Sequence, residues 1–148
     1  MHGRSSSHRR KVKNMHDALL YTYRAVVISA YDGDTITVDI DLGLGIWARG
    51  QKIRLARINT PELRGEEREK GLIARNYVRE RLVGKQIVLR TDKDRTGKYG
   101  RWVGEVLLPA TEQIIPSHLD KIAAQNGFEY VNFNDQLVRE GFAEYVSY

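Results

Sequence analysis

Two stretches near the start of the chain have the hydrophobic and polar patterns of β-strands. Between residues 35 and 42, apolar and polar side chains alternate strictly, which places the apolar ones on one face of a strand. The preceding segment 24–31 is short, β-branched and apolar, and it predicts another strand. Asp32-Gly33-Asp34 between them predicts a tight turn. The two strands are therefore expected to form a hairpin.

A third strand is predicted at about residues 52–58, after a glycine-rich loop at 43–50. Arg54 lies out of phase with the apolar residues on either side of it, so it faces away from the core if they face it. The following corner, Asn59-Thr60-Pro61-Glu62, offers an amide oxygen, a hydroxyl and a carboxylate around a rigid proline. A guanidinium fork beside a carboxylate suits the oxygens of a phosphoryl group, and it also suits a structural ion pair at a strand end.

The second half of the chain begins with a helical pattern. Apolar residues at 74, 77, 78 and 82 fall at helical spacing, and Gly84 is placed to end the helix. Two more strands are predicted at 86–91 and 99–108, with a polar turn at 92–97 between them.

The C-terminal third contains a long connection and a last helix. The segment 109–131 is longer than a hairpin needs, and Ser117 with Asp120 after it predicts a short capped helix there. A final helix is predicted from an Asn134 cap to Gly141, followed by an extended segment to residue 148. Five strands with a helix between the third and the fourth match the partly open Greek-key barrel of the oligonucleotide- and oligosaccharide-binding (OB) fold.

Composition adds one domain boundary. The 148 residues are enough for a single core, and the formal net charge of +5 is confined to residues 1–16, which hold five basic residues and no acid. We expect residues 1–20 to form a basic, disordered tail and residues 21–148 to form the OB-fold domain. Such a tail either adds salt-sensitive attraction to phosphate polymers or serves only as a solvated start.

Several classes of protein are excluded or disfavoured by residue content. The chain has no cysteine, so disulfides, a thiolate nucleophile and cysteine-ligated zinc are excluded. Its four histidines include His118, which has no partner at metal-ligand spacing, so a zinc site is disfavoured. Since no apolar run approaches the roughly 18 to 20 residues of a membrane span, we expect a soluble, cytoplasmic protein.

Three separated motifs carry a family resemblance when they are taken together. They are Asp32-Gly33-Asp34-Thr35, Arg54 with the corner 59–62, and Lys98-Tyr99-Gly100-Arg101 at the start of the fifth predicted strand. In this order, from about Tyr23 to Tyr145, the chain resembles the staphylococcal nuclease (thermonuclease) family. The resemblance implies a calcium-dependent phosphodiesterase that cleaves DNA and RNA and prefers single strands.

The resemblance also implies roles for individual residues. Glu62 matches the acid that activates the attacking water, and Arg54 and Arg101 match the two arginines that grip the scissile phosphate. Lys98 and Tyr99 match residues near a terminal phosphate of the bound nucleotide.

The implied calcium ligands are Asp34, Asn59 and the backbone carbonyl of Thr60. The founding member of the family has aspartate where this chain has Asn59. An amide oxygen ligates calcium without adding charge, so we expect weaker calcium binding here. Asp39 and Asp41 either compensate for the missing charge or are polar positions on an alternating strand.

A second departure concerns base stacking. The family's base-stacking tyrosine falls on Ser147, which has a tyrosine on the C-terminal side and another two residues before it. We expect little sequence preference, because arginines and a metal that bind phosphate contact the nucleic-acid backbone and not the bases. We also expect the nuclease to be a monomer. The alternative, which Asn59 favours, is a catalytically impaired OB-fold module that only binds nucleic acid.

Overall fold

The computed structural model describes residues 20–96, 100–109, 121–123 and 129–147. The tail expected at residues 1–20 lies outside these ranges except for Leu20, and so do Lys98, Tyr99 and His118. Within the described ranges, none of the helices combines the length and the apolar character that crossing a bilayer requires.

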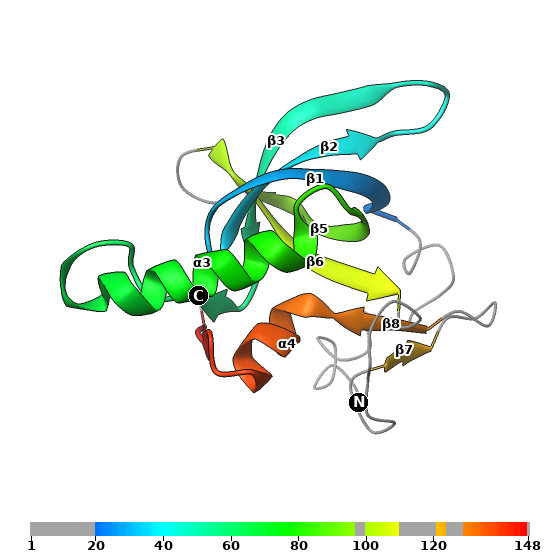
Figure 1. Cartoon of the computed structure of the whole chain (residues 1–148). Helices are drawn as coiled ribbons and strands as arrows, with labels where there is room; N and C mark the ends of the chain where they lie inside the picture. Colours follow the sequence, from blue (N-terminus) through cyan, green and yellow to red (C-terminus); the bar gives the residue numbers. More distant parts are fainter. Residues whose placement is uncertain (1–19, 97–99, 110–120, 124–128, 148) are drawn as a thin grey trace.

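Five strands form a closed, mixed β-barrel, which confirms the predicted OB-fold architecture (Figure 1). The strands are β1 (Thr22–Asp32), β2 (Thr35–Asp41), β3 (Trp47–Leu55), β5 (Gln86–Thr96) and β6 (Trp102–Pro109). Neighbouring strands are antiparallel in the order β3-β2-β1-β5-β6. The barrel closes because the end of β3, at residues 53–55, pairs in parallel with the start of β6.

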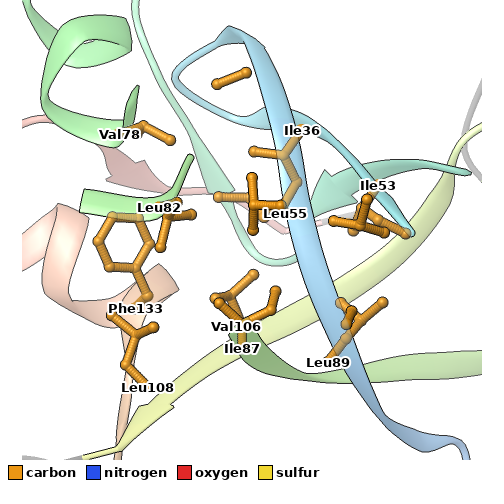
Figure 2. Packing of buried hydrophobic residues seen from close by; sticks show 14 of the residues in the cluster. Ile36, Ile53, Leu55, Val78, Leu82, Ile87, Leu89, Val106, Leu108 and Phe133 are labelled. Carbon is orange, nitrogen blue, oxygen red and sulfur yellow. The ribbon is translucent and has the colours of Figure 1, made fainter. Parts of the chain in front are cut away.

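The barrel interior is filled by the apolar side of each alternating strand. Figure 2 shows Ile36, Ile53, Leu55 and Ile87 gathered there, and none of them is more than 1% exposed. The predicted period of two in β2 is thus the period of its burial. Burial of apolar surface of this kind is the main stabilising contribution to folding.

Helix α3 (Arg68–Leu82) follows a short 3-10 turn, η2 (Gly65–Glu67), and packs on β1. Ala74, Val78 and Leu82 form its buried face, so the predicted helical spacing is confirmed. Gly84 ends it in the left-handed region with φ 84°, and its N–H donates to the Val27 carbonyl at 2.8 Å.

Three strand predictions are corrected. The segment 47–50, predicted as loop, is the first part of β3, since the hairpin turns within residues 42–46. Strand β3 ends at Leu55, and Ala56 and Arg57 form a turn before β4 (Ile58–Asn59). Strand β5 continues to Thr96 through the predicted turn, and β6 begins at Trp102.

The C-terminal part returns along the barrel. Strands β7 (Lys121–Ala123) and β8 (Glu129–Asn132) extend the sheet beside β6, and β9 (Glu144–Tyr145) pairs with β4. The helix predicted in the connection is wrong for residues 121–123, which are β7, while the predicted cap Ser117 lies outside the described residues.

Helix α4 (Phe133–Arg139) is capped by Asn132, whose side chain accepts from the Asp135 N–H at 3.1 Å, and not by Asn134 as predicted. Asn134 is instead fully buried. Its amide group donates to the carbonyls of Ala56 and Gly104, and its oxygen accepts from the Val106 N–H.

Candidate active site

The turn between β1 and β2 presents two carboxylates. Asp34 donates its backbone N–H to Asp32 Oδ1 at 3.1 Å, which closes a local side-chain turn. Gly33 between them is required by close packing, because a Cβ there would lie 2.8 Å from the Thr60 side chain. The tight Asp-Gly-Asp turn thus brings the corner after β4 against the start of β2.

Asp34 is the centre of the site. It is 7% exposed, and its Oδ2 accepts from the Thr60 N–H at 3.0 Å. Its Oδ1 accepts from the Thr35 hydroxyl at 3.3 Å, and Arg54 Nη2 lies 3.6 Å from Oδ2. The structure therefore joins the first and second sequence motifs through one carboxylate.

Arg54 faces away from the core, as its strand phase predicts, while Ile53 and Leu55 are fully buried. Its Nη1 donates to the Leu55 carbonyl at 2.8 Å and its Nη2 to Asn59 Oδ1 at 3.1 Å. Only 13% of the side chain is exposed. A guanidinium group held in this way keeps its direction with little side-chain freedom left to lose.

Arg101 reaches the same place from the segment before β6. Its Nη1 donates to the Thr35 hydroxyl at 3.2 Å, and that hydroxyl in turn contacts Asp34. The two predicted phosphate-binding arginines are thus brought together around Asp34 and Thr35, although they are 47 positions apart in the sequence.

Glu62 lies two residues beyond Thr60 and is exposed. Its N–H donates to Glu67 Oε1 at 3.0 Å, and its carbonyl packs so closely on Gly71 of α3 that a Cβ at Gly71 would clash. The corner 59–62 is therefore held at Thr60 by Asp34 and at Glu62 by α3.

The carboxylate that the sequence analysis did not assign is Asp32. Burial and the neighbouring charge of Asp34 raise the pKa of Asp32 to about 6, while Arg54 opposes the shift. The sequence held one signal for it, since Asp32 and Asp34 flank a single glycine, but only the turn shows that their side chains interact.

The oxygen atoms at this site are of the type that a hard cation prefers, but few of them carry charge. All the donors are oxygens, and the buried Thr60 Oγ1 has no hydrogen-bond partner among the described residues. No group of three or more acidic, histidine or cysteine side chains in the described part of the chain is arranged to hold a metal. In addition, the amide oxygen of Asn59 already accepts from Arg54.

Asp39 and Asp41 lie farther along the hairpin and serve the hairpin itself. Asp39 accepts from the Gly50 N–H at 2.9 Å and from Arg49 at 3.0 Å, and Asp41 accepts from the Gly43 N–H at 2.8 Å. The hydrogen bond from Gly50 is the main cause that lowers the pKa of Asp39. These contacts support the interpretation of both residues as polar positions of a strand.

The C-terminal tyrosine nearest the expected base-stacking position has other contacts. The Tyr145 hydroxyl donates to Asp135 at 2.9 Å, and the Arg57 guanidinium lies 5.8 Å from the ring centroid. Ser147 is exposed, and Tyr148 lies outside the described residues, as do the predicted substrate contacts Lys98 and Tyr99.

Comparisons with curated proteins and with family models gave different results. A search of curated proteins found no match. The family model described as "Staphylococcal nuclease homologue" matches residues 52–148, a range that includes Arg54, the corner 59–62 and Arg101, whereas Asp32 and Asp34 precede it. Because this range covers more than half of the chain, the protein belongs to the staphylococcal nuclease homologue family.

Proposed function

We propose that the protein is a calcium-dependent nuclease that hydrolyses phosphodiester bonds of DNA and RNA. The observation that carries this proposal is the meeting of Arg54 and Arg101 at the Asp34–Thr35 pair, next to the corner that bears Glu62. Two cations from distant segments of the chain, beside a cluster of oxygens, form a setting for a phosphate group. Family membership supports nuclease chemistry in general.

Arg54 and Arg101 would bind the non-bridging oxygens of the scissile phosphate. Negative charge on these oxygens grows as the attacking oxygen approaches phosphorus, so fixed guanidinium groups stabilise the transition state more than the ground state. The burial of Arg54 strengthens this effect because the site is less screened by water.

Glu62 would act as the general base. It would accept a proton from water as the water oxygen forms a bond to phosphorus. The bond from phosphorus to the leaving sugar oxygen would break, and that oxygen would take a proton from solvent. An exposed carboxylate can exchange the accepted proton with solvent after each turnover.

Asp34, Asn59 and Thr60 would hold the calcium ion, with Asp32 beside them. When bound, the ion supplies positive charge that polarises the phosphate and orients water. Asp34 would provide a charged ligand and the other two neutral oxygens. Affinity for calcium follows the number of charged ligands, so weak binding is expected.

The substrate is expected to be read through its backbone, with a preference for single strands and little preference for sequence. The groups at the site are cations and oxygens that suit phosphate, and none of the described ones forms a base-edge reader. Lys98 and Tyr99 remain proposed contacts to a terminal phosphate.

A second candidate is a nucleic-acid-binding module without turnover. The hydrogen bond from Arg54 to Asn59 favours it, because it engages the amide oxygen that would otherwise bind calcium. In this case the two arginines would bind phosphate, but no calcium ion would orient a water molecule from which Glu62 could accept a proton.

One experiment separates the two candidates. Single-stranded DNA is incubated with the protein in calcium, with and without a chelator, and the products are resolved on a gel. Cleavage that the chelator abolishes supports the nuclease, while binding without cleavage supports the module. Glu62→Gln should lower the rate by roughly a hundredfold to ten-thousandfold at unchanged thermal stability. Undiminished cleavage by that variant would exclude Glu62 as the base.

A further inference from the structure

The β2–β3 hairpin extends away from the barrel (Figure 1). Arg54 is near the end of β3 where that strand joins the barrel. In the register of the two strands, Thr35 is opposite Arg54 and Thr37 is opposite Lys52. Side chains of the intervening residues, such as Ile53, point into the core. Lys52 and Arg54 therefore project from the same face of β3, roughly 7 Å apart along the strand.

A β-bulge in the hairpin changes which residues share this face. Gln51 is opposite Val38, but Ala48 is opposite Ile40, so two residues of β3, Arg49 and Gly50, face one residue of β2. Gly50 has φ 66°, a conformation that glycine adopts readily.

The extra residue moves Trp47 to the outer face. Without it, Trp47 would have the inward phase of Ile53, whereas in this register Trp47 is opposite Asp41 and Ala48 is opposite the buried Ile40. Trp47, Lys52 and Arg54 thus lie in a row on one face of the hairpin.

The row has the composition of a surface that binds single-stranded nucleic acid. Trp47 is 37% exposed, and the Arg49 guanidinium lies 4.9 Å from its ring centroid. Lys52 is exposed and has no hydrogen-bond or ion-pair partner among the residues that the structure describes. Single strands are bound by cations that track the backbone and by aromatic rings on which bases stack.

The acidic side chains on the same face determine whether a base or a phosphate of a bound nucleic acid is favoured at each position. The carboxylate of Asp39 is paired with Arg49, so it repels phosphate little. Asp41 accepts only from the Gly43 backbone in the described contacts, and it lies opposite Trp47. A base is therefore favoured over a phosphate beside Trp47, and a phosphate is favoured beside Lys52.

We propose that the outer face of the β2–β3 hairpin binds the part of a single strand that extends beyond the scissile phosphate, with Lys52 on a backbone phosphate and Trp47 stacked on a base. This rests on the proposed function, because Arg54 at the end of the row is taken as a ligand of the scissile phosphate. Lys52 and Arg54 are roughly 7 Å apart along β3, so they can contact successive phosphates of one extended nucleic-acid strand.

Binding is measured with cleavage suppressed, in the Glu62→Gln background, by the fluorescence anisotropy of a labelled oligothymidylate of about twelve nucleotides in calcium. Trp47→Ala should raise the Kd about tenfold, since a stacked base is lost. Trp47→Phe should retain most of the affinity. Lys52→Ala should weaken binding and reduce the slope of log affinity against log salt by roughly 0.7, the loss of one phosphate contact to a single strand.

Lys85→Ala is the matched control, because Lys85 is an exposed lysine that lies between α3 and β5 rather than on the hairpin. It should leave both the Kd and the salt slope unchanged. Far-UV circular dichroism and thermal melting establish that each variant is folded. A parallel loss of affinity in Trp47→Ala, Lys52→Ala and Lys85→Ala would show a non-specific effect of charge or stability and would overturn the inference.

The outcomes for the hairpin and for the proposed function are distinct. If the parent protein cleaves DNA but Trp47→Ala and Lys52→Ala bind as tightly as the Glu62→Gln background, the hairpin is excluded while the nuclease assignment holds. If the parent does not cleave but both variants bind less tightly, the hairpin surface holds and the nuclease fails. Failure of the Glu62→Gln protein to bind the oligonucleotide overturns the inference.

Discussion

Arg54 and Arg57 are three residues apart in the chain, yet their surroundings differ in one decisive respect. Arg57 contacts two carboxylates closely: Nε and Nη2 donate to Glu105 at 2.7 and 2.9 Å, and Nη1 lies 2.9 Å from Asp135. Arg54 is more buried, but its carboxylate partner Asp34 is 3.6 Å away, and its short hydrogen bonds go to neutral oxygens.

The shorter ion pairs of Arg57 indicate a structural role, whereas the longer contact of Arg54 with Asp34 is compatible with its proposed role at the site. The hydrogen bond to Glu105 is the main cause that raises the pKa of Arg57. Arg57 also has φ 69° in the turn before β4, and its carbonyl accepts from the Val146 N–H at 2.9 Å. The ion pairs thus tie that turn to β6 and α4, and the backbone bond ties it to the C-terminal segment. Arg54 has no such short ion pair, which suits its proposed role of binding an incoming anion.

The strongest test of the comparison is the loss of activity at the two positions. Arg54→Ala should lower kcat/KM by roughly a hundredfold to a thousandfold, the usual cost of one donor to a developing oxyanion. Arg54→Lys should recover little, because a single ammonium group lacks the planar fork. The assay is DNA cleavage in calcium at a temperature where every variant is folded. An equal loss of activity in Arg57→Ala would remove the distinction.

The second test is stability at Arg57. Removing one partner from a buried ion-pair network typically costs 3–5 kcal/mol, but Arg57 is 43% exposed and water screens its charges. Arg57→Ala should therefore lower the free energy of unfolding by about 1–3 kcal/mol, measured by urea denaturation. Arg68→Ala at the exposed start of α3 is the control, with a change close to zero expected. A free energy of unfolding unchanged in Arg57→Ala would show that the network contributes nothing net.

The two arginines also show how far sequence reasoning reaches. Arg54 was predicted to face away from the core because local alternation determines the side of a strand, and the structure agrees. Nothing in the sequence around Arg57 marks its role, because Glu105 and Asp135 are 48 and 78 positions away. Local spacing carries information about neighbours on one strand and none about such distant partners.

The same limit explains one further error and one feature that the sequence analysis did not assign. Asn132 and Asn134 are equally suitable caps by local sequence, and the contacts of Asn134 with Ala56 and Gly104 decide between them. The raised pKa of Asp32 depends on burial, which only the packed turn creates. The fold was predictable because strand periodicity is local, while the position of each polar partner was not.

A third test makes the surroundings of Arg54 more like those of Arg57. Asn59→Asp adds a carboxylate where Arg54 now has an amide oxygen at 3.1 Å, and it adds charge to the proposed calcium site. Calcium should bind more tightly by about one or two decades, as measured by titration calorimetry. Asn59→Ala is the control and should bind calcium no more tightly than the parent. Equal calcium affinity in Asn59→Asp and the parent would remove Asn59 from the site.

The smallest effect is expected at a third arginine, Arg49, which is 68% exposed and pairs with Asp39 on the hairpin. Contacts with Gly50 and Arg49 lower the pKa of Asp39, so the folded state favours its charged form. The stabilisation is present above the unfolded pKa of about 4 and is lost as the pH falls through the lower folded value. Asp39→Asn should therefore have a slightly lower urea midpoint than the parent at neutral pH, and the two midpoints should converge as the pH falls below that folded value. A difference in urea midpoint that persists or widens in acid would show that Asp39 acts through the bulge geometry alone. The ion pair with Arg49 would then make no contribution to the stability of the hairpin.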